Sequence, residues 1–160
     1  MKFALLIVSV TALMVPAISC AGSPATPTSP ASQPIGFAGT WNGTGVDSQG
    51  ATTVIWSLTE TAAAVSGTVT TQAVDPNDGS CNSCHRNKSG TVSGTISGTK
   101  LTLTMFFAAG VSGDPTPACS ATVTGTASST GEGTLAVEYS GADTCEGPFT
   151  NGTLAMARRP

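Results

Sequence analysis

The chain has 160 residues, and only 9% of them are Asp, Glu, Lys or Arg, against roughly 25% in an ordinary soluble domain. Six basic and nine acidic residues give a formal net charge of −3, which disfavours the basic surface that a nucleic-acid-binding protein needs. Gly, Pro, Thr and Ser fill 73 positions and are neutral or poor in helix interiors, so an all-β protein is expected.

The first residues have the pattern of an export signal. Lys2 precedes an apolar stretch, Phe3 to Val15, which is shorter than the about 20 residues that span a bilayer. The following Ala17-Ile18-Ser19-Cys20 resembles the lipobox of bacterial lipoproteins, in which the Cys becomes the lipid-modified N-terminus. We expect residues 1–19 to be the signal peptide and Cys20 to carry the lipid. Cleavage by an ordinary signal peptidase, which would give a soluble secreted protein, is the alternative.

The segment after the lipobox has the composition of a tether. Residues 21–34 contain four Pro and no charge or large apolar side chain, so they cannot bury enough surface to become ordered. We expect residues 20–34 to hold a single folded domain, residues 35–160, away from a membrane. This places the protein in the bacterial cell envelope, facing the periplasm or the cell exterior, with the membrane as a partner through the anchor.

The folded domain is organised by a Gly-Thr dipeptide that recurs nine times. The clearest strand is Lys100 to Phe107, in which Leu101, Leu103, Met105 and Phe107 share one face with a period of two. The same alternation predicts no helix and eight strands, at about 36–46, 52–60, 63–71, 89–97, 99–107, 119–127, 132–140 and 148–158.

Short connections between these strands predict an antiparallel up-and-down meander. Turn signals lie at residues 47–50, Ser97-Gly98 and Ser128-Ser129. Closing the meander into an eight-stranded barrel removes both sheet edges, which otherwise invite aggregation. The interior of such a barrel is just wide enough for packed side chains or one small ligand.

Motifs at both ends of the meander resemble those of calycins, the lipocalin-like and avidin-like barrels. Gly39-Thr40-Trp41 is similar to their Gly-x-Trp, and Arg158-Arg159 to their terminal Arg. The wider pattern, with Ser-Gly-Thr-Val-Ser-Gly-Thr at residues 89–95, also resembles a group of bacterial lipoproteins. The resemblance implies that Trp41 closes one end of the barrel under a cation from the last strand. It implies no ligand, because the ligand-contacting residues of avidin have no positional match here.

Four cysteines remain after the lipobox, and an even number in an exported domain predicts disulfides, with three pairings open. We favour Cys119 with Cys145, since both lie at strand ends, and Cys81 with Cys84 as a local bridge. Alternatively, either Cys81 or Cys84 could form a disulfide with Cys119 or Cys145. A zinc site is disfavoured because Cys119 and Cys145 do not form a second closely spaced pair, so no metal is expected.

The stretch Cys81-Asn82-Ser83-Cys84-His85 also matches the signature for attachment of c-type haem. An alternative function is therefore a small exported electron-transfer protein, with haem c held by Cys81, Cys84 and His85. We favour no cofactor, because the motif lies in a loop without a helix to wrap a haem. A thiol-redox loop is a third alternative.

The sequence contains few candidate catalytic residues, so we expect that the protein is not an enzyme. The acidic residues are scattered, His85 is the sole His, and no Gly-x-Ser-x-Gly motif occurs. We instead expect a binding or structural domain, whose partner, if it binds, is a small molecule.

Large apolar residues are scarce, and this limits where such a ligand could bind. A shallow pocket at the open end would use Trp41, Trp56 and Met105, whereas the alternative is a packed core without a cavity. In either case the residues expected to face inward are Trp41, Val54, Trp56, Leu58, Leu103, Met105, Val123, Leu135 and Val137.

Overall fold

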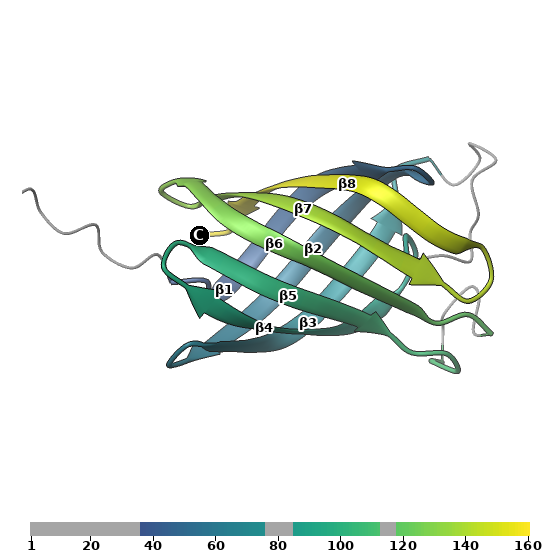
Figure 1. Ribbon diagram of the computed structural model, residues 1–160, viewed down its shortest axis with the longest axis horizontal. Helices are drawn as coiled ribbons and strands as arrows, with labels where there is room; N and C mark the ends of the chain where they lie inside the picture. The colour runs from purple at the N-terminus through teal and green to yellow at the C-terminus, as the bar shows by residue number, and fades with distance from the viewer. Residues whose placement is uncertain (1–35, 76–84, 113–117) are drawn as a thin grey trace, which may run out of the picture. The chain divides into compact units, whose positions relative to one another are not determined.

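The computed structural model describes residues 36–75, 85–112 and 118–160, and within them the chain is all-β. Eight antiparallel strands follow one another around a closed barrel and run obliquely about it (Figure 1). They are β1 Gly39–Asp47, β2 Gly50–Thr61, β3 Ala64–Ala73, β4 Ser89–Ser97, β5 Lys100–Phe107, β6 Ala121–Gly131, β7 Thr134–Asp143 and β8 Gly147–Arg158. Over these ranges there is no helix with the length and apolarity of a transmembrane span.

The predicted meander is confirmed, and all eight expected strands are present. β1 closes the barrel by pairing with β8, from Trp41 opposite Arg158 to Val46 opposite Thr153. The predicted turn at Ser128-Ser129 is wrong, because both residues lie within β6 and pair with β7. The chain turns later, at residues 132–133, where Gly133 supplies a positive φ of 69° that other residues adopt at a cost.

The barrel interior is filled by the inward side of every strand. Alternation places most Thr and Ser outward and most aliphatic or aromatic side chains inward, where Trp41 and Trp56 are fully buried; Thr52 and Thr71 are buried exceptions. All nine residues expected to face inward are in the core. An interior of eight strands therefore holds packed side chains, as the width of such a barrel predicts.

The recurring Gly-Thr dipeptide has a structural explanation in the curvature of the barrel. A Cβ on Gly67 would lie 2.0 Å from the Ser57 carbonyl oxygen, and one on Gly43 would lie 2.1 Å from the Ala155 carbonyl oxygen. No side chain fits at such a distance, so these glycines let adjacent strands bend toward each other. The same crowding against backbone occurs at the inward glycines 90, 94 and 125, whereas Gly152 leaves room for the Tyr139 ring. The Thr that follows each of these glycines points outward.

Candidate functional site

One end of the barrel is closed by Trp41, as the calycin resemblance implies. Its ring is fully buried, its Nε1 donates a hydrogen bond to the Phe37 carbonyl oxygen at 2.8 Å, and the Arg158 guanidinium lies 4.5 Å from the ring centroid. Arg158 also donates to the carbonyl oxygens of Ala38, at 2.7 Å, and Gly36. A cation over an aromatic face is favourable, and together these contacts seal this end.

The opposite end is closed by a short segment, residues 85–88, which we call the plug. Its backbone is held to β3: Thr71 N donates to the Lys88 carbonyl oxygen at 2.8 Å, and Thr71 Oγ1 donates to the His85 carbonyl oxygen at 2.5 Å. His85, Arg86 and Lys88 are each no more than 3% exposed. The plug side chains contact β1, β8 and the chain just before β6, so the segment lies across the barrel mouth.

Asp47 is the centre of the polar contacts in this mouth. Its Oδ2 lies 2.8 Å from His85 Nε2 and accepts a hydrogen bond from Tyr139 Oη at 2.8 Å, while Oδ1 accepts from Gln49 N. Burial alone would raise the pKa of Asp47, but the hydrogen bonds and the charge of His85 outweigh it and lower the pKa. Burial and the neighbouring Asp47 carboxylate raise the pKa of Tyr139, so its phenol stays neutral.

The plug also stacks on the apolar wall of the mouth. The His85 ring lies nearly parallel to that of Phe149, with centroids 3.8 Å apart, and Tyr139 meets Phe149 edge-on. His85 Nδ1 is buried and has no hydrogen-bond partner among the described residues. The imidazole is thus fixed by one ring nitrogen and one ring face.

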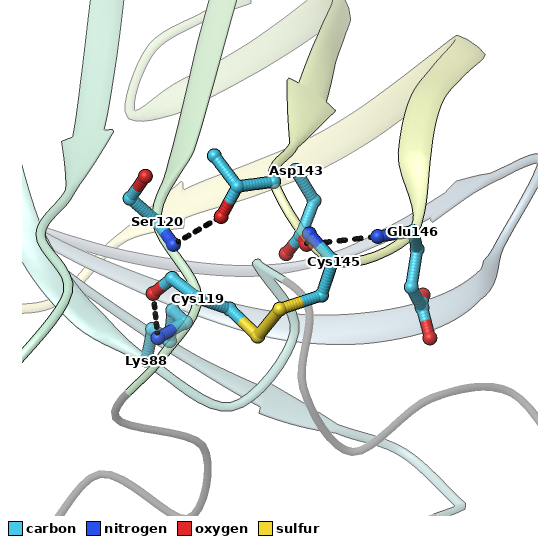
Figure 2. The surroundings of a disulfide bond; sticks show 7 residues. Lys88, Cys119, Ser120, Asp143, Cys145 and Glu146 are labelled. Atoms are coloured by element: carbon cyan, nitrogen blue, oxygen red, sulfur yellow. Dashed lines mark hydrogen bonds between the residues drawn. A yellow bond between two sulfur atoms is a disulfide. The ribbon is translucent and has the colours of Figure 1, made fainter.

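The predicted Cys119–Cys145 disulfide is confirmed and lies beside the plug (Figure 2). Its Cα atoms are 5.6 Å apart, and Lys88 Nζ donates to the Cys119 carbonyl oxygen at 2.7 Å. Asp143 Oδ1 accepts from the backbone N–H of Cys145 and Glu146. The disulfide therefore ties the chain before β6 to the β7–β8 turn. The sulfurs and the Asp143 carboxylate lie within 4.8 Å of one another, but both sulfurs are bonded to each other.

The contacts of His85 do not fit the haem alternative. Cys81 and Cys84, and the expected bridge between them, lie outside the described residues. A haem ligand needs a ring nitrogen that faces the iron, whereas one nitrogen of His85 bonds Asp47 and the other is buried in the mouth. The described residues therefore give the electron-transfer alternative no support.

The three residues expected to contact a ligand in the interior all lie in the core. Trp41 and Trp56 are fully buried and Met105 is 5% exposed, each packed against neighbouring inward side chains. Trp56 Nε1 has no partner among the described residues. With both ends closed, these side chains form the filling of the barrel and not the lining of an open pocket.

An open groove instead lies on the outer wall, across β5 to β8. Its volume is about 670 Å³. It is lined by Thr102, Thr124, Gly125, Thr126, Glu138, Tyr139, Ser140, Asn151, Gly152 and Thr153. We call this feature the outer groove. Sequence reasoning missed it, although the Thr-x-Thr alternation of β6 indicates the row of hydroxyls that forms much of its lining.

A β-bulge adds Asn151 to this groove. The β7–β8 pairing shifts between Tyr139 opposite Gly152 and Gly141 opposite Phe149, so two residues of β8, Thr150 and Asn151, face one residue of β7. Asn151 has a φ of 56°, a conformation that Asn tolerates better than most residues. Thr150 and Asn151 are both exposed. The bulge thus directs an amide side chain outward, a common use of bulges near binding sites.

Comparisons with known proteins match the barrel architecture. No protein-family model and no curated protein match the chain. Among solved structures, an mFAP2b barrel bound to DFHBI aligns with a TM-score of 0.52 and 11% identity, over 76% of this chain and 93% of that chain. A redesigned β-barrel, b11L5F_LGL, gives 0.51 and 13%, over 77% and 91%. A de novo designed fluorescence-activating β-barrel gives 0.50 and 17%, over 77% and 94%. At these identities the similarity shows a shared fold.

Proposed function

We propose that this chain is a lipid-anchored protein of the bacterial cell envelope whose barrel is a non-enzymatic binding domain. The anchor rests on the sequence: the apolar stretch, the lipobox-like Ala17-Ile18-Ser19-Cys20 and the uncharged tether of residues 21–34 occur in the order that a lipoprotein requires. A small barrel on such a tether would be held near the membrane and would be accessible to molecules that diffuse through the envelope.

The observation that carries the binding proposal is the closed, filled interior combined with an open groove on the wall. Trp41 with Arg158 closes one end, and the plug closes the other. The mFAP2b neighbour is described as bound to DFHBI, which illustrates that barrels of this architecture can bind small molecules. In this chain we assign the ligand to the outer groove, because the interior already holds its own side chains.

The lining of the outer groove supports binding without catalysis. Glu138 is its one carboxylate, and the lining contains no His, Lys, Arg or Cys among the described residues. General acid–base chemistry uses paired groups that exchange protons with the substrate, and hydrolysis through a nucleophile needs an adjacent base. A single carboxylate among hydroxyls is suited to hydrogen bonding.

Metabolic labelling tests the anchor. Cells of the native host, grown with an alkyne-bearing fatty acid, should incorporate the label into this protein, and the label should remain with the membrane fraction. The Cys20→Ser variant should lose the label, while the Cys81→Ser variant should keep it and serve as the matched control. A wild-type protein that stays unlabelled and is recovered in the soluble fraction would contradict the proposal.

A further inference from the structure

We infer that the outer groove binds a neutral oligosaccharide. This inference names the ligand class of the proposed binding function and therefore rests on it. The polar groups that line it are hydroxyls, one amide and one carboxylate, beside two glycines, and among the described residues the lining includes no cation. An anionic ligand would meet the Glu138 charge without a compensating positive group, and an apolar ligand would cover polar groups without satisfying them.

Apart from the Tyr139 hydroxyl, which donates to Asp47, the polar side chains of the outer groove are available to a ligand. Within the described part of the chain, no hydrogen bond joins the side chains of Glu138, Asn151 or Thr153 to another protein group. Two outward threonines elsewhere on the wall are already engaged: Thr53 Oγ1 donates to the Gln72 carbonyl oxygen and Thr59 Oγ1 to that of Ser66. The outer groove thus gathers donors and acceptors that the fold itself leaves unused.

Their arrangement follows from the strand register. Thr102 lies opposite Thr126, Thr126 opposite Glu138, and Glu138 opposite Thr153, so one row of polar side chains crosses four strands. With neighbouring strands about 4.8 Å apart, the row is about 14 Å long. Donors and acceptors at this spacing fit a chain of a few sugar rings, each of which carries hydroxyls around its edge. The Glu138 carboxylate can accept from two adjacent sugar hydroxyls at once.

A second row places an aromatic ring on the same outer wall, beyond the lining of the groove. Thr104 lies opposite Thr124, which is opposite Ser140, and the next outward residue of β5 is Phe106, opposite Thr122. The Phe106 side chain is 48% exposed, so much of its ring is accessible from the outer wall. An exposed aromatic face can stack on the C–H face of a sugar ring, which hydroxyl-lined walls alone cannot contact favourably.

Calorimetric titration of the full chain, purified in detergent from membranes of the native host, tests the inference. The probes are chitohexaose, cellohexaose and maltohexaose, with a sulfated hexasaccharide as the anionic control. At least one neutral probe should bind saturably, and the sulfated probe should bind at least tenfold more weakly. A preference for chitohexaose would indicate an N-acetylated glycan of the cell-wall kind, and a preference for the glucose oligomers would indicate a plain hexose polymer.

Matched variants locate the binding. Glu138→Ala and Asn151→Gly should each weaken binding about tenfold, since hydrogen bonds to a charged group or an amide are lost. Asn151→Gly suits the positive φ at that position, so the fold should be retained. Glu132→Ala, which removes an exposed carboxylate in the β6–β7 turn, should leave binding unchanged.

Two results would overturn the inference: no neutral probe binds the folded chain at millimolar concentration, or the groove variants bind as tightly as the wild type. Labelling of Cys20 with no binding of sugars would refute the ligand class and leave the anchor intact. Sugar binding by a chain that is not labelled at Cys20 would refute the anchor alone.

Discussion

His85 shows how much one side chain contributes to closing this barrel. It bonds Asp47 of β1 and stacks on Phe149 of β8, and its neighbour Lys88 bonds the chain before β6. Groups that are charged or polar lose hydration when they are buried, so each must be compensated by a partner. In a chain with so few charges, the burial of Asp47, Lys88 and Asp143 at one end is costly, and it is offset by hydrogen bonds to His85, to the Cys119 carbonyl oxygen and to backbone N–H groups.

We predict that His85→Ala destabilises the barrel by about 3 kcal/mol, because it leaves the Asp47 carboxylate buried without its imidazole partner. Urea unfolding followed by tryptophan fluorescence measures this value, with Lys100→Ala as a control on the exposed surface. Adding Asp47→Asn to His85→Ala should restore part of the loss, because the uncompensated charge is then removed. A loss below about 0.5 kcal/mol for His85→Ala would show that the pair contributes little.

Asp47 predicts how stability responds to acid. Its pKa is lowered in the folded state, so the group stabilises the fold above its unfolded pKa of about 3.9 and loses that contribution as the pH falls through the lower folded value. Unfolding free energies measured between pH 2 and 7 should therefore decline below pH 4. The decline should be shallower in Asp47→Asn, and equal slopes in the two proteins would contradict the assignment.

Tyr139 predicts how stability responds to alkaline pH. Its folded pKa is raised, so its contribution is complete below the unfolded pKa of about 10 and is lost as the pH rises beyond that value. Alkaline titration of stability should show a steeper decline above pH 10 in the wild type than in Tyr139→Phe. The absorbance change of phenol ionisation should accompany unfolding, which exposes Tyr139; ionisation in the still-folded protein at pH 10 would refute the raised pKa.

Recurring glycines allow neighbouring strands to approach each other closely. Gly67 lies where β2 and β3 approach so closely that even a methyl group would contact the Ser57 carbonyl oxygen at 2.0 Å. The contact is with backbone, which cannot rotate away as a side chain can. A substitution there must move a strand and so affects the closure of the barrel.

Gly67→Ala should accordingly cost about 3 kcal/mol or prevent folding, at the upper end of what overpacking costs. Ser66→Ala, at the neighbouring outward position, removes only an exposed hydroxyl contact with Thr59 and should change stability by less than about 0.5 kcal/mol. Thermal unfolding followed by circular dichroism compares the two variants. Similar melting temperatures would show that the strands have room for a side chain at position 67.

The strands could be predicted from the sequence more completely than the tertiary contacts between them. A period of two and the turn residues suffice for the eight strands, and Leu103 and Met105 could be placed inward because alternation is a local property. The turn assigned to Ser128-Ser129 was wrong because Ser is also accepted within a strand, where both residues pair with β7. The decisive signal was Gly133, whose positive φ a turn requires.

The plug and the outer groove could not be predicted, because both depend on distant pairings. His85 follows a stretch rich in Asp, Asn, Gly and Ser that reads as surface loop, and its partner Asp47 is 38 positions away. The outer groove needs the register of four strands and the bulge at Asn151, neither of which periodicity determines. These are the features of the molecule that bear most directly on function.

At the scale of the whole molecule, a closed barrel is combined with the proposed membrane anchor. Pairing of β1 with β8 leaves no free sheet edge within the described barrel, so the wall is presented to the surroundings by side chains alone. Those side chains are mainly hydroxyls. A domain of this kind on a membrane tether would bind through its wall, with the anchor setting where it acts.

The measurement that tests this account most directly is the intact mass of the mature protein, taken without reduction from membranes of its native host. We predict a mass that fits residues 20–160 plus acyl chains, less the hydrogens lost in two disulfides, Cys119–Cys145 and Cys81–Cys84. A mass that lacks acyl chains would contradict the anchor. Added mass matching one haem on Cys81 and Cys84 would contradict the account as a whole and make electron transfer the leading function.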